Sequence, residues 1–181
     1  RKESEVKSVE KAYKYRIYPN KKQKEIIAKT FGCCRFVYNK YLAKRIEMYE
    51  QNKETFSYVQ CANDMKKLKS ELEWLKEVDS TALQSSLKDL DMAYQKFFKE
   101  HSGYPKFKSK KDKQSALFPS EAISKKNTFD KREITLTQSC KNIKFRCSDL
   151  YFSRLQRYKD MIRSATLSKT KSGNFFLSIL I

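Results

Sequence analysis

The chain has 181 residues, with 40 Lys and Arg against 21 Asp and Glu, and so a formal net charge of +19. Like charges in this number repel one another in a compact state, which predicts a polyanionic partner, nucleic acid above all. Hydrophobic residues make up 39% of the chain, enough to bury a core, which excludes a wholly disordered protein. No apolar run reaches the roughly 18 residues of a membrane span, and no signal-peptide pattern is present.

The chain begins with a charged stretch and a strand. Residues 1–10 have no hydrophobic period and predict a frayed start. Tyr13, Tyr15 and Ile17 then alternate with basic or polar residues, which predicts a half-buried strand with a basic outer face. Pro19 is expected to end this strand.

Three helices are predicted next. Asn20, Ser57 and Asp79 are their N-cap candidates, the first two with a Gln three residues later as in a capping box. Gly32 is expected to kink or break the first helix. Trp74 and Leu75, after the second helix, are expected to pack it down. The apolar stripe of the third helix consists of Leu83, Leu87, Leu90, Tyr94 and Phe97.

The remaining chain predicts a loop and then strands. Lys106 to Lys113 holds five Lys in eight residues, so residues 104–130 are interpreted as a basic loop and linker. From Glu133 onward the hydrophobic period falls to two, which predicts strands. These strands contain Ile134 and Leu136, Ile143 to Cys147, Ala165 and Leu167, and 175–181, with a hairpin turn at 171–174 and a short helix that turns Leu150 and Leu155 inward.

This order of elements predicts an α+β fold, a small antiparallel β-barrel interrupted by an inserted helical bundle. The first strand, cut off from the others by about ninety residues of helix, would rejoin them in space. The predicted parts are a first barrel strand in 1–20, helices in 21–103, the linker in 104–130 and the other barrel strands in 131–181. Because the chain stops inside an apolar strand, we expect it to be the front part of a longer protein.

Signatures of catalysis are missing from the sequence. The five cysteines lack the paired spacing of a zinc site and predict reduced, buried thiols in a cytoplasmic protein. His101 is the only histidine, the three glycines are not clustered, and the acidic residues sit mostly on helix faces. We therefore predict no catalytic centre, no metal site and no cofactor within this chain.

Three clusters mix basic with aromatic or amide side chains, a combination that suits nucleic acid because cations neutralise phosphates and rings stack on bases. The first cluster surrounds the opening turn, where the N-terminus of a helix also offers free N–H groups. The predicted contacts are Tyr15, Arg16, Tyr18, Lys21 and Lys22, then Arg35, Tyr38, Asn39 and Lys40, and finally Lys106, Phe107, Lys108, Lys110 and Lys111.

Five segments in order resemble the TnpB/OrfB proteins of insertion-sequence transposons, RNA-guided DNA endonucleases related to compact type V CRISPR effectors. These segments are YRIYPN at 15–20, FGCCRFVYN at 31–39, DSTALQSSL at 79–87, YPKFK at 104–108 and the strand pair in 162–181. The resemblance implies a wedge-like barrel with an inserted helical recognition domain. By resemblance, these parts bind the scaffold of a guide RNA and read a short motif beside a double-stranded DNA target.

The resemblance also implies specific readers. Tyr58, Ser80, Thr81 and Gln84 match the motif-reading region, and Gln84 is the leading candidate because Gln can pair bidentately with adenine. The RuvC-like nuclease domain, with its magnesium-binding carboxylates and zinc-binding segment, has no counterpart in this chain. Magnesium and zinc are thus implied only for a C-terminal domain that this chain lacks.

Three hypotheses follow. The first is the RNA- and DNA-binding front half of such an endonuclease, located in the cytoplasm of a prokaryote with the nucleoid. The second is a stand-alone DNA-binding protein or repressor, derived from such a transposase and without nuclease activity. The third, a general RNA-binding protein such as a ribosomal protein, explains the charge but none of the five matching segments.

Overall fold

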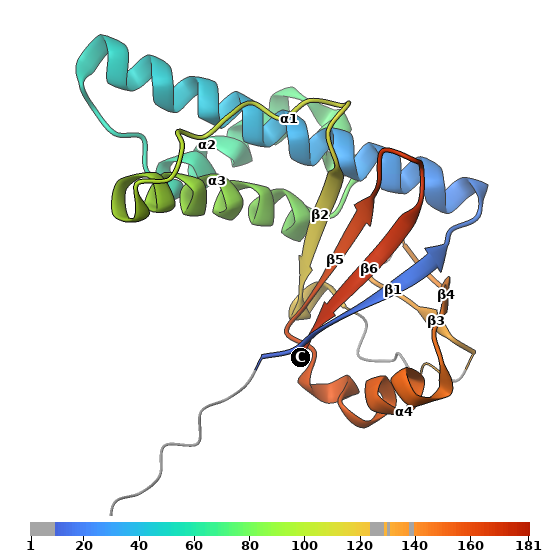
Figure 1. Ribbon diagram of the computed structural model, residues 1–181. Coiled ribbons are helices and arrows are strands. Elements are labelled where there is room, and N and C mark those ends of the chain that lie inside the picture. The colour runs from blue at the N-terminus through green and yellow to red at the C-terminus, as the bar shows by residue number, and fades with distance from the viewer. Residues whose placement is uncertain (1–9, 124–128, 130, 138–139) are drawn as a thin grey trace, which may run out of the picture.

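The computed structural model describes residues 10–123, 129, 131–137 and 140–181 (Figure 1). Helices and strands are both present, which confirms the α+β class. In chain order the elements are β1 (Ala12–Tyr18), α1 (Lys21–Asn52), α2 (Tyr58–Glu71), η1 (Glu73–Glu77), α3 (Ser80–Glu100), β2 (Gln114–Pro119), η2 (Ser120–Ala122), β3 (Glu133–Ile134), β4 (Ile143–Arg146), α4 (Asp149–Arg157), η3 (Lys159–Met161), β5 (Ser164–Lys169) and β6 (Phe175–Leu180).

The strands form one curled antiparallel sheet in the order β2-β5-β6-β1-β4-β3. As predicted, β1 rejoins the later strands, with Ile17 opposite Phe175 of β6 on one side and Phe145 of β4 on the other. The described strands leave β2 and β3 as edges, so the predicted small antiparallel barrel takes the form of a half-barrel. Since β6 is paired on both sides, its apolar sequence is not an exposed edge.

The predicted linker 104–130 was wrong in one part, because residues 114–119 form β2 and pair with β5. Ala116 and Phe118 are the reason, since they alternate with Ser115 and Leu117 and are 4% and 1% exposed. This alternation is short and directly follows a run of lysines, so charge alone predicts a loop where the strand begins. Tertiary pairing with β5 completes the strand.

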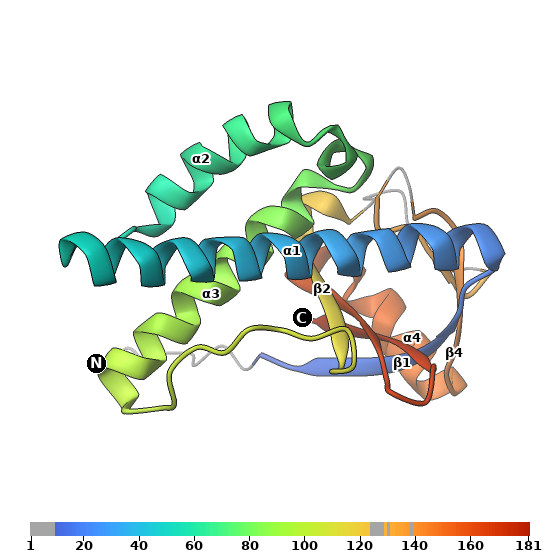
Figure 2. The same cartoon turned by 90° about the horizontal axis from the view of Figure 1, so that it is seen from above.

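Helix α1 is continuous from Lys21 to Asn52, so the predicted break at Gly32 was wrong (Figure 2). Its start is as predicted: Asn20 accepts a hydrogen bond from the Gln23 amide, and the Gln23 side chain accepts one from the Asn20 amide. A mid-helix Gly costs about 1 kcal/mol relative to Ala. Packing of the helix on both sides of Gly32, where Phe31 is buried, outweighs that cost.

The other helices begin where the caps predict. Ser57 forms a second capping box with Gln60, and Asp79 accepts from the Thr81 amide at the start of α3. The predicted inward packing of Leu75 and Leu155 is confirmed, since both are fully buried. That of Trp74 and Leu150 was wrong, because these residues are 42% and 58% exposed.

The helices and the sheet share one hydrophobic cluster. It runs from Ile27 and Phe31 of α1 through Leu87 of α3 to Phe118 of β2 and Leu177 of β6. In Figure 1, α1 lies along one end of the strands, while α2 and α3 lie to one side of the sheet. This arrangement places the start of α1 beside the turn that joins β5 to β6.

Candidate nucleic-acid interface

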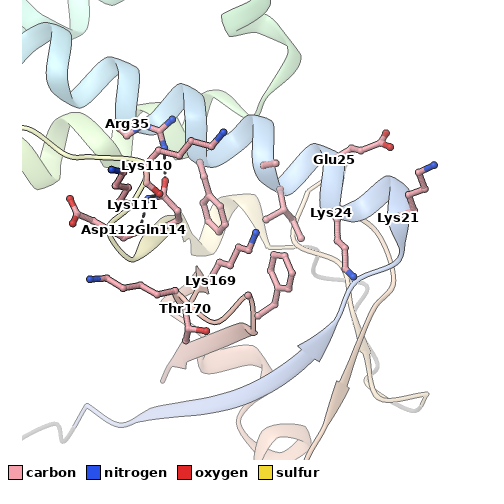
Figure 3. A pocket seen from close by; sticks show the side chains of 16 residues that line it. Lys21, Lys24, Glu25, Arg35, Lys110, Lys111, Asp112, Gln114, Lys169 and Thr170 are labelled. Atoms are coloured by element: carbon pink, nitrogen blue, oxygen red, sulfur yellow. Dashed lines mark hydrogen bonds between the residues drawn. The ribbon is translucent and has the colours of Figure 1, made fainter.

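A groove of about 780 Å³ lies between the first half of α1, the turn at 109–112 and the β5–β6 hairpin (Figure 3). Ile27 and Phe31 of α1 and Phe175 of β6 contribute apolar lining. Two carboxylates, Glu25 and Asp112, also line the groove. Its seven basic residues are Lys21, Lys24, Arg35, Lys110, Lys111, Lys169 and Lys171.

Basic residues outnumber carboxylates in the lining of this groove by seven to two. Five ion pairs join described residues, and none of them includes a basic residue of the groove. Free cations that converge on one hollow from three separate chain segments attract a polyanion and repel one another without it. The groove therefore has the electrostatic character of a phosphate-binding surface.

Gln114 holds the basic turn in place. Its Nε2 donates to the carbonyl oxygens of Ser109 at 3.0 Å and Asp112 at 2.8 Å, and its Oε1 accepts from Arg35 Nη1 at 2.6 Å. Figure 3 shows Arg35 and Gln114 side by side at the edge of the groove. One amide thus fixes both the turn and the Arg35 guanidinium, which reduces the entropy that ordering them on a ligand would require.

A second device joins α1 to the strap, as we name residues 104–113. Asn39 Nδ2 donates to the Lys108 carbonyl and Asn39 Oδ1 accepts from the Lys108 amide, both at 2.8 Å. The Lys108 ammonium lies 4.1 Å from the centre of the Tyr38 ring. The Tyr104 hydroxyl shares a 2.9 Å hydrogen bond with that of Tyr94 on α3. The second and third predicted clusters are therefore adjacent.

The predicted nucleic-acid contacts differ in their exposure: some are buried in the core and others are open to solvent. Tyr15 and Tyr38 are 3% and 5% exposed, so their rings lie in the core, and burial raises the pKa of Tyr15 to about 12. Neither ring is open to a base. Tyr38 and Asn39 hold the strap, whereas Arg35 lines the groove. Exposed side chains among the other predicted contacts of the three clusters are those of Tyr18, Lys21, Lys22, Lys40, Lys106, Phe107, Lys108, Lys110 and Lys111.

The outer face of the sheet carries a second basic group, which we name the basic-aromatic face: Lys14, Arg16, Tyr18, Arg146 and Phe176. The Arg16 and Arg146 guanidinium groups lie 5.6 and 5.0 Å from the centre of the Tyr18 ring. Lys14 and Arg16 lie 4.5 and 5.3 Å from the Phe176 ring. Cations against ring faces are a common arrangement in surfaces that bind nucleic acid.

Register explains this face. Arg16 stands directly opposite Arg146 on β4 and Phe176 on β6. Its Nη2 donates to Asn174 Oδ1 at 2.6 Å, which connects the face to the hairpin at the groove. Like charges directly opposite each other on neighbouring strands destabilise a sheet, so this pair favours an external anion.

The four predicted motif readers lie on the helices. Ser80 and Gln84 are exposed one turn apart on α3, and Tyr58 packs against the core at the start of α2. Thr81 is held by Asp79, which accepts from both its amide and its hydroxyl. None of the four lines the groove.

The predicted contacts leave out five basic residues of these surfaces: Lys14, Lys24, Lys169, Lys171 and Arg146. Lys169 precedes the predicted hairpin turn at 171–174 and Lys171 is its first residue, and a pair of lysines at a turn is a usable signal. For Arg146 the sequence predicts only a place in the strand from Ile143 to Cys147. Its proximity to Arg16 depends on the pairing of strands far apart in sequence.

The described residues offer neither a metal site nor a reactive thiol. Among the described residues, no three His, Cys, Asp or Glu side chains form a group that could hold a metal ion. The five cysteines are free, and burial raises the pKa of Cys34 to about 12 and that of Cys140 to about 11. Within the part of the chain that the structure describes, no helix has the length and apolar character needed to cross a membrane.

Comparison with known proteins gives a family. Residues 8–54 match the helix-turn-helix domain model of OrfB from IS605. In the structure, the described part of this match consists of β1 and the single uninterrupted helix α1. A "Putative RNA-guided DNA endonuclease" of Streptomyces pristinaespiralis is 33% identical over 97% of this chain and 42% of its own length.

Two further relatives are similar over shorter stretches. The "Putative RNA-guided DNA endonuclease InsQ" of Escherichia coli K12 is 34% identical over 60% of this chain and 27% of its own length. "Virulence protein VsdF" of Salmonella dublin is 33% identical over 57% of this chain and 96% of its own length. The chain spans less than half the length of the two endonuclease relatives. The family model and the Streptomyces relative, which aligns with 97% of this chain, agree with each other. The chain therefore belongs to the TnpB/OrfB family of insertion-sequence transposon proteins.

Proposed function

We propose that the chain is the nucleic-acid-binding N-terminal part of a transposon-encoded RNA-guided DNA endonuclease, which binds a guide RNA and recognises a short motif beside a double-stranded DNA target at the nucleoid. The observation that carries this proposal is the groove with seven basic residues from α1, the strap and the β5–β6 hairpin. None of the seven forms an ion pair with another described residue. The names of the two longer relatives agree with it.

The groove explains how the chain would bind phosphate backbones of either nucleic acid. Lys and Arg that contact phosphates release condensed counterions, so affinity falls steeply as salt rises. The basic-aromatic face adds rings that can stack on unpaired bases. The bases of a duplex are paired and are not open to such stacking. We assign the groove to backbone contacts and the α3 surface around Gln84 to reading of the DNA motif.

Salt dependence tests the groove. Affinities for a structured RNA and for duplex DNA are measured by fluorescence anisotropy across a range of salt, for the wild type and for Lys110→Gln and Lys169→Gln. Each substitution should lower the slope of log affinity against log salt by about 1. Lys66→Gln, on an exposed part of α2, is the matched control and should leave the slope unchanged. Equal slopes for all variants would contradict the assignment of the groove.

Motif reading has a separate test. Gln84→Ala should remove preference among duplexes that differ in short motifs, while affinity for RNA stays the same, because the exposed Gln84 side chain lies outside the groove. Gln51→Ala changes another exposed glutamine and serves as the control. Unchanged motif preference in Gln84→Ala would show that the reader lies elsewhere.

The metals implied by the family resemblance do not fit the described residues, because these contain no group of three possible ligands. We therefore propose a binding role, without metal chemistry, for the described residues.

A second candidate function has one specific observation in its favour. VsdF aligns with this chain over 96% of its own length, so nearly all of that relative corresponds to residues of this chain. This favours a stand-alone nucleic-acid-binding protein. Duplex binding with motif preference but no RNA affinity would support the second candidate over the first.

A further inference from the structure

No contact with another described residue explains why position 32 is a glycine. It lies in the middle of α1 without a positive φ, where Ala would favour the helix by about 1 kcal/mol. A Cβ atom built at Gly32 meets no other atom within 4 Å, so no internal close contact requires glycine either. Glycine also allows an external ligand to approach the backbone closely. With a positive φ and an internal contact both excluded, this approach is the explanation that we adopt for Gly32.

Gly32 lines a hollow of about 620 Å³. Phe36 and Trp74 form its aromatic side, and Arg35 and Lys40 bring positive charge, with no carboxylate in the lining. The residues that α1 contributes to the lining lie on one face of the helix, because they follow Gly32 by three, four, seven and eight positions: Arg35, Phe36, Asn39 and Lys40. Of the nearby acidic residues in η1, Glu77 is already paired with Lys29 at 2.6 Å, whereas Glu73 is exposed and has no ion pair among the described residues.

Trp74 is shaped for stacking. Its ring meets Phe36 edge to face, with centroids 4.9 Å apart and planes at 69°, and 42% of the residue remains exposed. A supported but open indole presents a flat surface at low entropic cost, since its rotamer is already restricted. Bases stack on such rings without regard to sequence.

We propose that the hollow between Gly32 and Trp74 binds one unpaired nucleobase, stacked on Trp74, with Arg35 and Lys40 contacting the neighbouring phosphates. Glycine at position 32 lets the base lie against the α1 backbone, and its missing side chain leaves the space open. The inference rests on the proposed function, because it names which form of nucleic acid this chain holds. A duplex does not fit, since its bases are paired and stacked on each other.

Trp74 is the only tryptophan of the chain, so its fluorescence reports on this site alone. The whole 181-residue chain is titrated with single strands of about 12 nucleotides, as RNA and as DNA, and with the matching duplex. Anisotropy of a label on the oligonucleotide measures binding in parallel. Single strands should quench Trp74 in a saturable manner and the duplex should not. Quenching by RNA alone or by DNA alone identifies the source of the base.

Gly32→Leu fills the hollow while favouring the helix, so a loss of binding is separable from a loss of folding. We expect an unchanged or higher melting temperature, loss of quenching, and at least about fivefold weaker single-strand binding, the smallest effect expected of one stacked base. Gly32→Ala, whose methyl has free space, should be fully folded and give a smaller loss. Ala43→Leu, at an exposed site three turns along α1, is the matched control.

Anisotropy changes without quenching of Trp74, or equal quenching by the duplex, would overturn the inference and leave the proposed function standing. Wild-type binding by both glycine variants would also overturn it. No anisotropy change with any nucleic acid would overturn the inference and the proposed function together.

Discussion

Asn39 and Lys108 are 69 positions apart and hold each other by two hydrogen bonds of 2.8 Å. The Asn39 side chain pairs with the Lys108 backbone as a neighbouring strand would, and so ties the strap to α1. The same segment continues into the 109–112 turn at the groove. The position of the groove lysines therefore depends on an amide that does not line the groove.

Replacing Asn39 by Leu should release the strap. Each of its two hydrogen bonds stabilises the folded state by about 0.5–1.5 kcal/mol, and Asn39→Asp should lose only the one that donates to the Lys108 carbonyl. Hydrogen exchange of the Lys108 amide should accelerate most in Asn39→Leu and less in Asn39→Asp. Asn63→Leu, exposed on α2, is the control, and equal protection in all variants would refute the role of Asn39.

Gln114→Glu separates the two tasks of this side chain. A carboxylate still accepts from Arg35, but it cannot donate to the carbonyl oxygens of the 109–112 turn and repels them. We expect a disordered turn and several-fold weaker binding of duplex DNA, with Arg35 still in place. Anisotropy titrations measure the affinity, and thermal melting checks the fold. Wild-type affinity would show that the turn needs no such support.

Arg146→Gln should change stability and binding in opposite directions. It removes the like-charge pair with Arg16, which should raise the free energy of unfolding at low salt by about 0.2–1 kcal/mol. It also removes a cation from the basic-aromatic face, so affinity for RNA should fall. Urea unfolding and anisotropy measure the two effects, with Arg157→Gln on exposed α4 as the control. A variant that loses both stability and affinity would contradict this account.

Asp64 should make the protein sensitive to acid. Burial by itself would raise the pKa of Asp64, but hydrogen bonds from Lys44 and Tyr41 outweigh it and hold that pKa below its ordinary value of 3.8. A carboxyl with a lowered pKa stabilises the fold above pH 3.8, and this stabilisation is lost as pH falls through the folded-state pKa.

Melting temperatures between neutral and strongly acidic pH test this sign. Asp64→Asn should be less stable than the wild type at neutral pH, and its melting temperature should fall less on acidification. Asp160→Asn, at an exposed position, should follow the wild-type profile. If Asp64→Asn lost as much stability in acid as the wild type, the pKa of Asp64 would not be lowered by folding.

Local chemistry in the sequence determined most of the elements. The caps at Asn20 and Ser57 bond to neighbours three residues away, and the stripe from Leu83 to Tyr94 repeats with the period of a helix, so both can be recognised without tertiary information. Where local preference and packing disagreed, packing prevailed. Gly32 stayed helical, and Ala116 with Phe118 became a strand despite the lysines before them.

The sequence by itself also determined that the chain is a basic, nucleic-acid-binding type of protein with aromatic residues among its cations. Only the tertiary structure decided which cations meet. Lys21, Lys110 and Lys169 line one groove because β1 pairs with β6 and the strap crosses α1, contacts between residues far apart in the chain. Such contacts depend on the packing of the whole core, which leaves no local pattern around any one lysine.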